Sequence, residues 1–184
     1  MKITHRTLLA SLLGLSLAAG AATLLKADPA KTSISAVFKQ MNVPVEAKFK
    51  KYAISIDYNP AKPDAAKATV EIDTASLDLG DVDMNKEVAK KDWFNSAQYP
   101  KATFVSSAIK PAGPGKLSVT GKLSIKGKSG DVTFPLTVKG EGAAQVFDGV
   151  LPIKRLAYNI GEGEWKDTGM VADDVTIKFH VTAQ

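Results

Sequence analysis

The sequence predicts an all-β protein, with eight antiparallel strands and one short helix. Three observations lead to this class. Apolar and polar residues alternate with a period of two along most of the chain, clusters of Pro, Gly, Asn and Asp interrupt the alternation, and the connections are short. One-sided alternation is typical of an antiparallel sheet that covers a core with one face. Such a sheet buries that face by folding into a sandwich or a barrel.

The first three strands follow from short alternating runs. Their apolar faces are Ile34, Ala36 and Phe38; then Val45, Ala47 and Phe49, continued by Tyr52, Ile54 and Ile56; then Ala68, Val70 and Ile72. A turn cluster at 59–64, Asn-Pro-Ala-Lys-Pro-Asp, separates the second strand from the third. We therefore expect strands over 32–39, 45–58 and 68–73.

A helix is expected over 83–91, where the alternation stops. Asp83 suits the N-cap, and Lys90 and Lys91 lie at the C-terminal end, where the helix dipole favours cations. The helix leads directly into a segment with four aromatic residues, Trp93, Phe94, Tyr99 and Phe104. Each aromatic side chain buries roughly 150–250 Å² when it packs in a core. We therefore expect Trp93, Phe94 and Tyr99 to close one end of the fold.

Five further strands are expected in the second half of the chain, over 102–109, 116–126, 131–139, 144–155 and 174–182. The clearest is 116–126, which places Leu117, Val119 and Leu123 on one face and Lys, Ser and Thr residues on the other. Pro135 lies in the middle of a predicted strand. Because proline cannot donate a ladder hydrogen bond, it predicts an edge, a bulge or a corner there.

The N-terminus has the pattern of a secretory signal peptide. Lys2 and Arg6 precede an uncharged apolar run over 8–22 that ends in small residues. This run is short for a membrane-spanning helix. We expect a signal peptide over 1–22, cleaved after Ala21 or Ala22, with cleavage after Ala27 as the alternative. The folded domain is expected over 28–184.

Composition argues against nucleic-acid binding and catalysis. From residue 28 on, the chain has 21 basic and 19 acidic residues, which is not the charge of a nucleic-acid-binding protein. There is no cysteine, and the two histidines are His5 in the leader and His180 on the outward face of the last strand. A catalytic triad or a zinc site is therefore not expected. We predict no enzyme activity, no metal site and no covalent cofactor.

A closed apolar sheet face without catalytic residues predicts a container. An eight-stranded barrel is either filled by its own side chains or holds one small ligand, and the pattern leaves both open. If a pocket exists, the shared register predicts twelve inward-facing residues in its wall. They are Phe38, Phe49, Ile54, Val70, Phe104, Leu123, Phe134, Leu136, Phe147, Ile153, Ile177 and Phe179.

The sequence resembles the YceI-like, polyisoprenoid-binding family. The segment Asp92-Trp-Phe-Asn, followed by Tyr99-Pro-Lys-Ala-Thr-Phe-Val-Ser, is similar to the family's D-F-F-D and Y-P-x-A-T-F-x-S motifs. Four more stretches agree in order: Asp28-Pro-Ala with Ser33, Ile72-Asp-Thr-Ala-Ser-Leu-Asp, Val119-Thr-Gly-Lys-Leu-Ser-Ile with Gly127, and Arg155-Leu-Ala-Tyr-Asn-Ile-Gly. The resemblance covers the chain from Asp28 to its end.

This resemblance implies a lipocalin-like eight-stranded barrel that encloses an isoprenoid chain in the periplasm. The expected function is that of a carrier or sequestering protein for an isoprenoid quinone or polyprenyl lipid, with a membrane redox or lipid-synthesis protein as candidate exchange partner. The alternative is a packed barrel that acts through its surface as a stress-response or protein-interaction factor. Lys31, Gln40 and Lys126 stand where the family often has histidine.

The segment 161–169 is expected to gate the pocket. It is rich in glycine and acidic residues, and it carries Trp165 between the last two strands. Glycine gives the backbone freedom to move, and a tryptophan in a polar loop can cover an apolar opening. Trp165 is therefore added to the predicted pocket residues. The alternative is a long hairpin loop with Trp165 on the outer wall.

Overall fold

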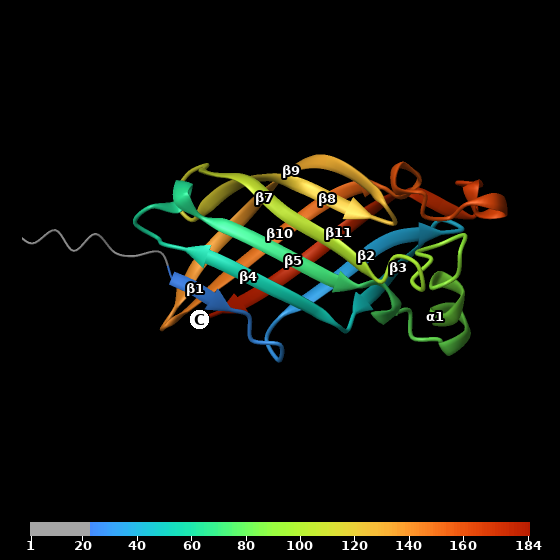
Figure 1. The fold of residues 1–184 in the computed structure, drawn as a ribbon, viewed down its shortest axis with the longest axis horizontal. Helices are drawn as coiled ribbons and strands as arrows, with labels where there is room; N and C mark the ends of the chain where they lie inside the picture. The colour runs from blue at the N-terminus through green and yellow to red at the C-terminus, as the bar shows by residue number, and fades with distance from the viewer. Residues whose placement is uncertain (1–22) are drawn as a thin grey trace, which may run out of the picture.

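The computed structural model describes residues 23–184, so the predicted signal peptide lies outside the described residues. Eleven antiparallel strands form one curled sheet in the order β1-β4-β5-β7-β8-β9-β10-β11-β2-β3-β6 (Figure 1). They are β1 (Thr23–Lys26), β2 (Ser33–Gln40), β3 (Val43–Phe49), β4 (Tyr52–Tyr58), β5 (Lys67–Asp73), β6 (Leu77–Asp78), β7 (Lys101–Pro111), β8 (Lys116–Ile125), β9 (Lys128–Glu141), β10 (Ala144–Lys154) and β11 (Val171–Ala183).

The helical elements are few and short. The α-helix α1 (Val82–Val88) lies at one end of the sheet, opposite the end that carries β1 (Figure 1). Four 3₁₀ turns complete the fold: η1 (Pro63–Ala65), η2 (Thr74–Ser76), η3 (Arg155–Tyr158) and η4 (Gly163–Lys166). Within residues 23–184, no helix is both long and apolar enough to cross a membrane.

The predicted fold class is confirmed, although the structure has eleven strands where eight were expected. The expected strand 45–58 is two strands, β3 and β4, separated at Lys50 and Lys51. The inward positions change parity there, from Ala47 and Phe49 to Ile56 and Tyr58. β3 pairs with β2, whereas β4 pairs with β5. The bend at Lys50 and Lys51 therefore moves the chain from the part of the sheet that contains β2 to the part that contains β5.

The sheet closes through β1, which was not expected. β1 pairs with β4, and the backbone of Lys26 exchanges hydrogen bonds of 2.8 and 3.0 Å with that of Gln184. Leu25 is buried in the core. Among the described residues, the sheet thus includes Thr23–Lys26, which precede the expected start of the domain at residue 28, and this strand joins β4 to the end of β11.

The helix differs from the prediction by its bounds and its cap. It covers 82–88 rather than 83–91, and its N-cap is Asp81 rather than Asp83. Asp81 Oδ1 accepts hydrogen bonds of 2.9 Å from the backbone N–H groups of Asp83 and Met84. Asp81 fills this role because its backbone is extended, as an N-cap requires.

A bulge in β7 changes which of its side chains point inward. A bulge between Ser106 and Ala108 in β7 shifts the register, so that Phe104 and Ile109 both face the core.

Pro135 lies in β9 one residue beyond the end of the pairing with β10, which stops at Leu136. Pro135 therefore occupies a free edge, as its missing N–H predicts.

Candidate functional site

The barrel is not packed shut: its inner faces enclose a cavity of about 330 Å³. All thirteen predicted pocket residues lie on its wall, which is almost entirely apolar. They are Phe38, Phe49, Ile54, Val70, Phe104, Leu123, Phe134, Leu136, Phe147, Ile153, Trp165, Ile177 and Phe179. They come from β2, β3, β4, β5, β7, β8, β9, β10, η4 and β11. Their contact with a ligand remains a prediction.

Aromatic rings form a continuous part of the wall. The ring centroids of Phe104 and Phe134 are 5.5 Å apart, and those of Phe134 and Phe179 are 5.4 Å apart with their planes at 80°. Gly121 on β8 makes room for Phe104, because a Cβ at Gly121 would lie 2.5 Å from the Phe104 ring. The ring therefore lies against the wall and leaves the centre of the barrel free.

The cavity reaches the surface between α1 and the end of β2. Gln40, Met84, Glu87 and Val88 all line it, and Met84 is 48% exposed to solvent. We call this opening the mouth. The helix α1, which lines it, lies at the end of the barrel opposite β1 (Figure 1). The gate expected at 161–169 stays a prediction. The sequence does not indicate that α1 lines the cavity, since a two-turn helix carries no signal that it will line a barrel.

Trp93 and Trp165 form one wall of the cavity at the same end. Trp93 is buried, and its ring centroid lies 5.2 Å from that of Trp165. Phe94 also lines the cavity and packs edge-on against Phe49 at 6.4 Å. Tyr99 does not line it: its half-buried ring lies against Gly127. The structure therefore brings two of the three predicted closing aromatics to the cavity.

Arg155 holds the segment that carries Trp165. It is buried, and its guanidinium lies over the Trp93 ring, 5.7 Å from the centroid. Its five N–H groups donate to five backbone carbonyls at 2.7–3.2 Å, those of Ile160, Gly161, Trp165, Val171 and Ala172. A guanidinium has five donors, so none remains for a ligand. Burial lowers the pKa of Arg155, and the charge of Asp173 opposes this shift.

Lys126 makes a second link to the same segment. It is buried, and its Nζ donates to the carbonyl of Asn159 at 2.7 Å and to Glu162 Oε2 at 2.8 Å. The hydrogen bond from Lys126 lowers the pKa of Glu162. The three positions where the family often has histidine are therefore dispersed. Lys126 ties down the loop, Gln40 lies at the mouth, and Lys31 is exposed on the surface.

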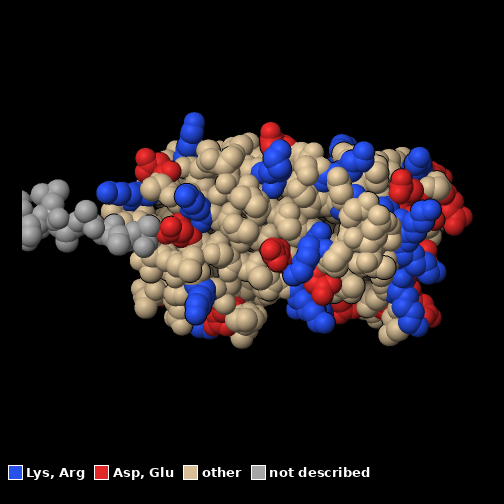
Figure 2. All heavy atoms as spheres, in the orientation of Figure 1, with Lys and Arg blue, Asp and Glu red and all other residues tan. Residues whose placement is uncertain are grey.

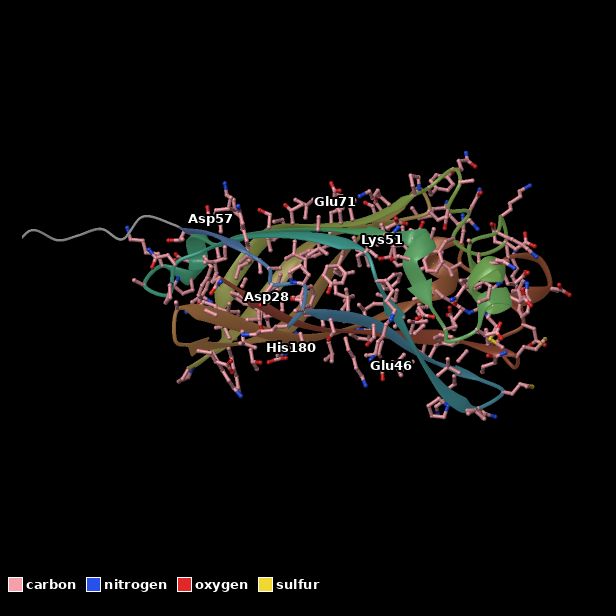
Figure 3. All side chains as sticks on the ribbon, turned by 90° about the horizontal axis from the view of Figure 1, so that it is seen from below. Asp28, Glu46, Lys51, Asp57, Glu71 and His180 are labelled. Carbon is pink, nitrogen blue, oxygen red and sulfur yellow. The ribbon has the colours of Figure 1, made fainter. Side chains whose placement is uncertain are left out.

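The outer wall carries His180, in agreement with its outward register. Its Nδ1 lies 2.7 Å from Asp148 Oδ1, and both side chains are about half exposed. Figure 3 shows His180 on β11 and Glu46 on β3, on the outer side of the barrel. Across residues 23–184, no three His, Asp or Glu side chains lie close enough together to hold a metal ion.

Comparison with known proteins identifies the relatives of this fold. The model of the YceI-like domain matches residues 25–183. A UPF0312 protein of Pseudomonas savastanoi pv. phaseolicola is 36% identical over 98 residues, 53% of this chain and 51% of its own length. The chain thus spans about half the length of the curated relatives it matches.

Solved structures agree with the family match. BcnA of Burkholderia cenocepacia is 59% identical with a TM-score of 0.84, over 86% of this chain and 99% of that one. The YceI protein of Campylobacter jejuni is 26% identical with a TM-score of 0.70, over 75% and 83%. A polyisoprenoid-binding domain of Saccharophagus degradans, implicated in plant cell wall breakdown, shares the fold at 18% identity and a TM-score of 0.68, over 87% and 97%. The chain belongs to the YceI-like family.

Proposed function

We propose that this member of the YceI-like family carries or sequesters an isoprenoid lipid, a quinone or a polyprenyl chain, in the cavity of its barrel. The observation that carries the proposal is an apolar cavity of about 330 Å³ that reaches the surface at one end. Burial of hydrocarbon stabilises a complex by about 0.8 kcal/mol per CH₂ group, so a few isoprene units supply most of a micromolar affinity. The structural relative from Saccharophagus degradans, a polyisoprenoid-binding domain, supports the same class of ligand.

The buried part of the ligand is uncharged in this proposal. Among the described residues that line the cavity, Arg155 is the one cation, and backbone carbonyls occupy all its donors. Among these lining residues, Gln40 carries a side-chain amide and Glu87 a carboxylate, and both lie at the mouth. A polar head group therefore lies at the mouth while the hydrocarbon tail extends along the barrel.

The setting and the class of activity are also part of the proposal. The apolar leader over 8–22 supports export to the periplasm, and a membrane redox or lipid-synthesis protein is the candidate partner for ligand exchange. The proposal assigns no catalytic residue. The ligand is held by shape and apolar contact alone.

Native mass spectrometry of the protein purified from its host tests the proposal. The expected result is a retained lipid whose mass matches an isoprenoid. Ala68→Phe fills the cavity from β5 and is expected to abolish retention, whereas Thr69→Phe, one residue along on the exposed face, is expected to preserve it. Absence of any retained lipid under gentle conditions, together with no uptake of added polyprenol, would refute the proposal.

A further inference from the structure

Exposed apolar side chains gather around the mouth of the cavity. Five of them, between 46% and 69% exposed, belong to the turn after β2, to the first residue of β3, to α1 and to the residue before β11. We call these five the apolar collar: Met41, Val43, Val82, Met84 and Met170. The described residues expose three other large apolar side chains, Leu24, Val105 and Val150, and these lie on β1, β7 and β10.

Three members of the collar surround Gln40, which lines the cavity. Gln40 is opposite Val43 on one side and Val171 on the other. The backbone N–H of Met41 donates to the carbonyl of Met170 at 2.8 Å. Met41, Val43 and Met170 therefore lie on the rim of the mouth, on the β2–β3–β11 side.

The other two members lie on α1, across the mouth. Val82 is the first residue of the helix, and Met84 both lines the cavity and is exposed. The helix has no buried residue. It is held by Asn85, whose Oδ1 accepts from the backbone N–H of Leu79 at 2.8 Å. Through Met84, the apolar surface continues from the outside of the protein into the cavity.

The charges around the collar are mixed. Lys86 pairs with Asp83 at 3.2 Å and Lys90 pairs with Glu87 at 2.5 Å, all on or beside α1. Figure 2 shows basic and acidic side chains together at this end of the molecule. A surface built to adsorb electrostatically on anionic lipid would instead gather lysine and arginine. The exposed feature that stands out here is apolar.

We propose that the apolar collar docks on the surface of a lipid bilayer by apolar insertion. This proposal rests on the lipid-binding function proposed above. A polyprenyl chain resides in bilayers, and an apolar path from bilayer to cavity lets it transfer without crossing water, where exposure of its CH₂ groups is unfavourable. Methionine suits such a contact because its side chain is flexible and apolar. The mouth then faces the acyl chains while the far end, with β1, points away from the bilayer.

Flotation of the purified protein with phosphatidylcholine vesicles tests the proposal. We expect binding that changes less than about twofold between low and high salt, because apolar contacts are not screened. The double variant Val43→Glu/Met170→Glu should reduce vesicle binding at least about tenfold, since two charges would enter the bilayer interface. The matched control Val105→Glu/Val150→Glu adds the same charges at exposed apolar positions on the barrel wall and should bind like the wild type.

Polyprenol binding is measured in parallel, with the polyprenol supplied from cyclodextrin instead of vesicles. This measurement distinguishes failure of the docking proposal from failure of the proposed lipid-binding function. Polyprenol binding without vesicle binding would overturn the docking proposal, leave the lipid-binding function intact and point to a protein partner at the collar. Binding confined to phosphatidylglycerol vesicles and lost in high salt would also overturn it, as would equal losses in both double variants. Failure to bind polyprenol in every variant would instead refute the proposed function.

Discussion

Gly149 on β10 lies directly opposite Phe179 on β11, and the phenyl ring of Phe179 occupies the space that a Cβ at Gly149 would take. Both residues face the inside of the barrel. Gly121 and the Phe104 ring make the same kind of close approach elsewhere on the inner wall. In both cases the glycine has no side chain, so the aromatic ring can lie flat against the sheet. The cavity stays open because the ring does not project into its centre.

The substitution Gly149→Ala is expected to narrow the cavity. The added methyl group would push the Phe179 ring toward the centre of the barrel, because backbone cannot move as readily as a ring. We expect about a tenfold loss of polyprenol affinity and a destabilisation of about 1–3 kcal/mol, measured by fluorescence titration and urea unfolding. The control is Gly140→Ala on β9, where a Cβ would meet Gln145 at an ordinary 3.6 Å. Equal affinities in wild type and Gly149→Ala would show that the ring does not restrict the ligand.

The substitution Trp93→Ala is expected to destabilise the protein by about 3–5 kcal/mol, as other large-to-small changes in cores do. Trp93 is buried between Trp165 and the guanidinium of Arg155, and both would lose their packing partner. Trp93→Phe is the milder control, since the Nε1 of Trp93 is buried without a hydrogen-bond partner and no such bond would be lost. Urea unfolding of the wild type, Trp93→Phe and Trp93→Ala checks that the free energy of unfolding decreases in that order. An unchanged melting temperature in Trp93→Ala would contradict the burial of this ring.

Trp165 is expected to report ligand entry. It lines the cavity and is half-buried, and the segment that carries it is tied down by Arg155 and by the Lys126–Glu162 pair. In a Trp93→Phe background, titration with a polyprenol should shift the emission of Trp165 to the blue, because the lipid displaces water near the indole. Saturable binding without a shift would remove Trp165 from the ligand contact and leave the carrier function standing.

The pairing of Lys126 with Glu162 is expected to make stability depend on pH. The pKa of Glu162 is lowered by the hydrogen bond from Lys126. A carboxyl group with a lowered pKa in the folded state stabilises the protein above its unfolded-state pKa, and this contribution is lost as the pH falls through the folded-state pKa. Wild type should therefore exceed Glu162→Gln in free energy of unfolding at pH 7, and the difference should shrink below about pH 4. A difference that stays constant from neutral to acidic pH would contradict this role.

The mature protein is expected to begin at Ala22 or Thr23. Cleavage after Ala27 would remove β1, and with it the buried Leu25 and the link between Lys26 and Gln184. Intact-mass analysis of the exported protein checks the position of the cut. A protein that starts at Asp28 should be less stable by about 2–5 kcal/mol, as for the loss of one buried leucine. Export with Asp28 as the first residue, at undiminished stability, would show that β1 is dispensable.

Much of the fold and of the cavity wall could be predicted from sequence because strand periodicity is a local property. Alternation along 116–126 and 174–182 is enough to assign Leu123, Ile177 and Phe179 to one face. Twelve of the thirteen predicted residues lie on strands, and they line the cavity because each strand keeps its own register. The free edge at Pro135 follows from the same local chemistry, since a missing N–H restricts where a strand can pair.

What only the tertiary structure decided depends on residues that are far apart in the chain. Closure of the barrel joins Lys26 to Gln184, and the room for Phe179 comes from Gly149 on another strand. The mouth lies between α1 and Gln40, which are far apart in the chain and meet only in the folded barrel. Periodicity determines which face of a strand is apolar. It carries no information on which strand, ring or helix will stand opposite that face, and those neighbours determine whether the barrel is filled or hollow.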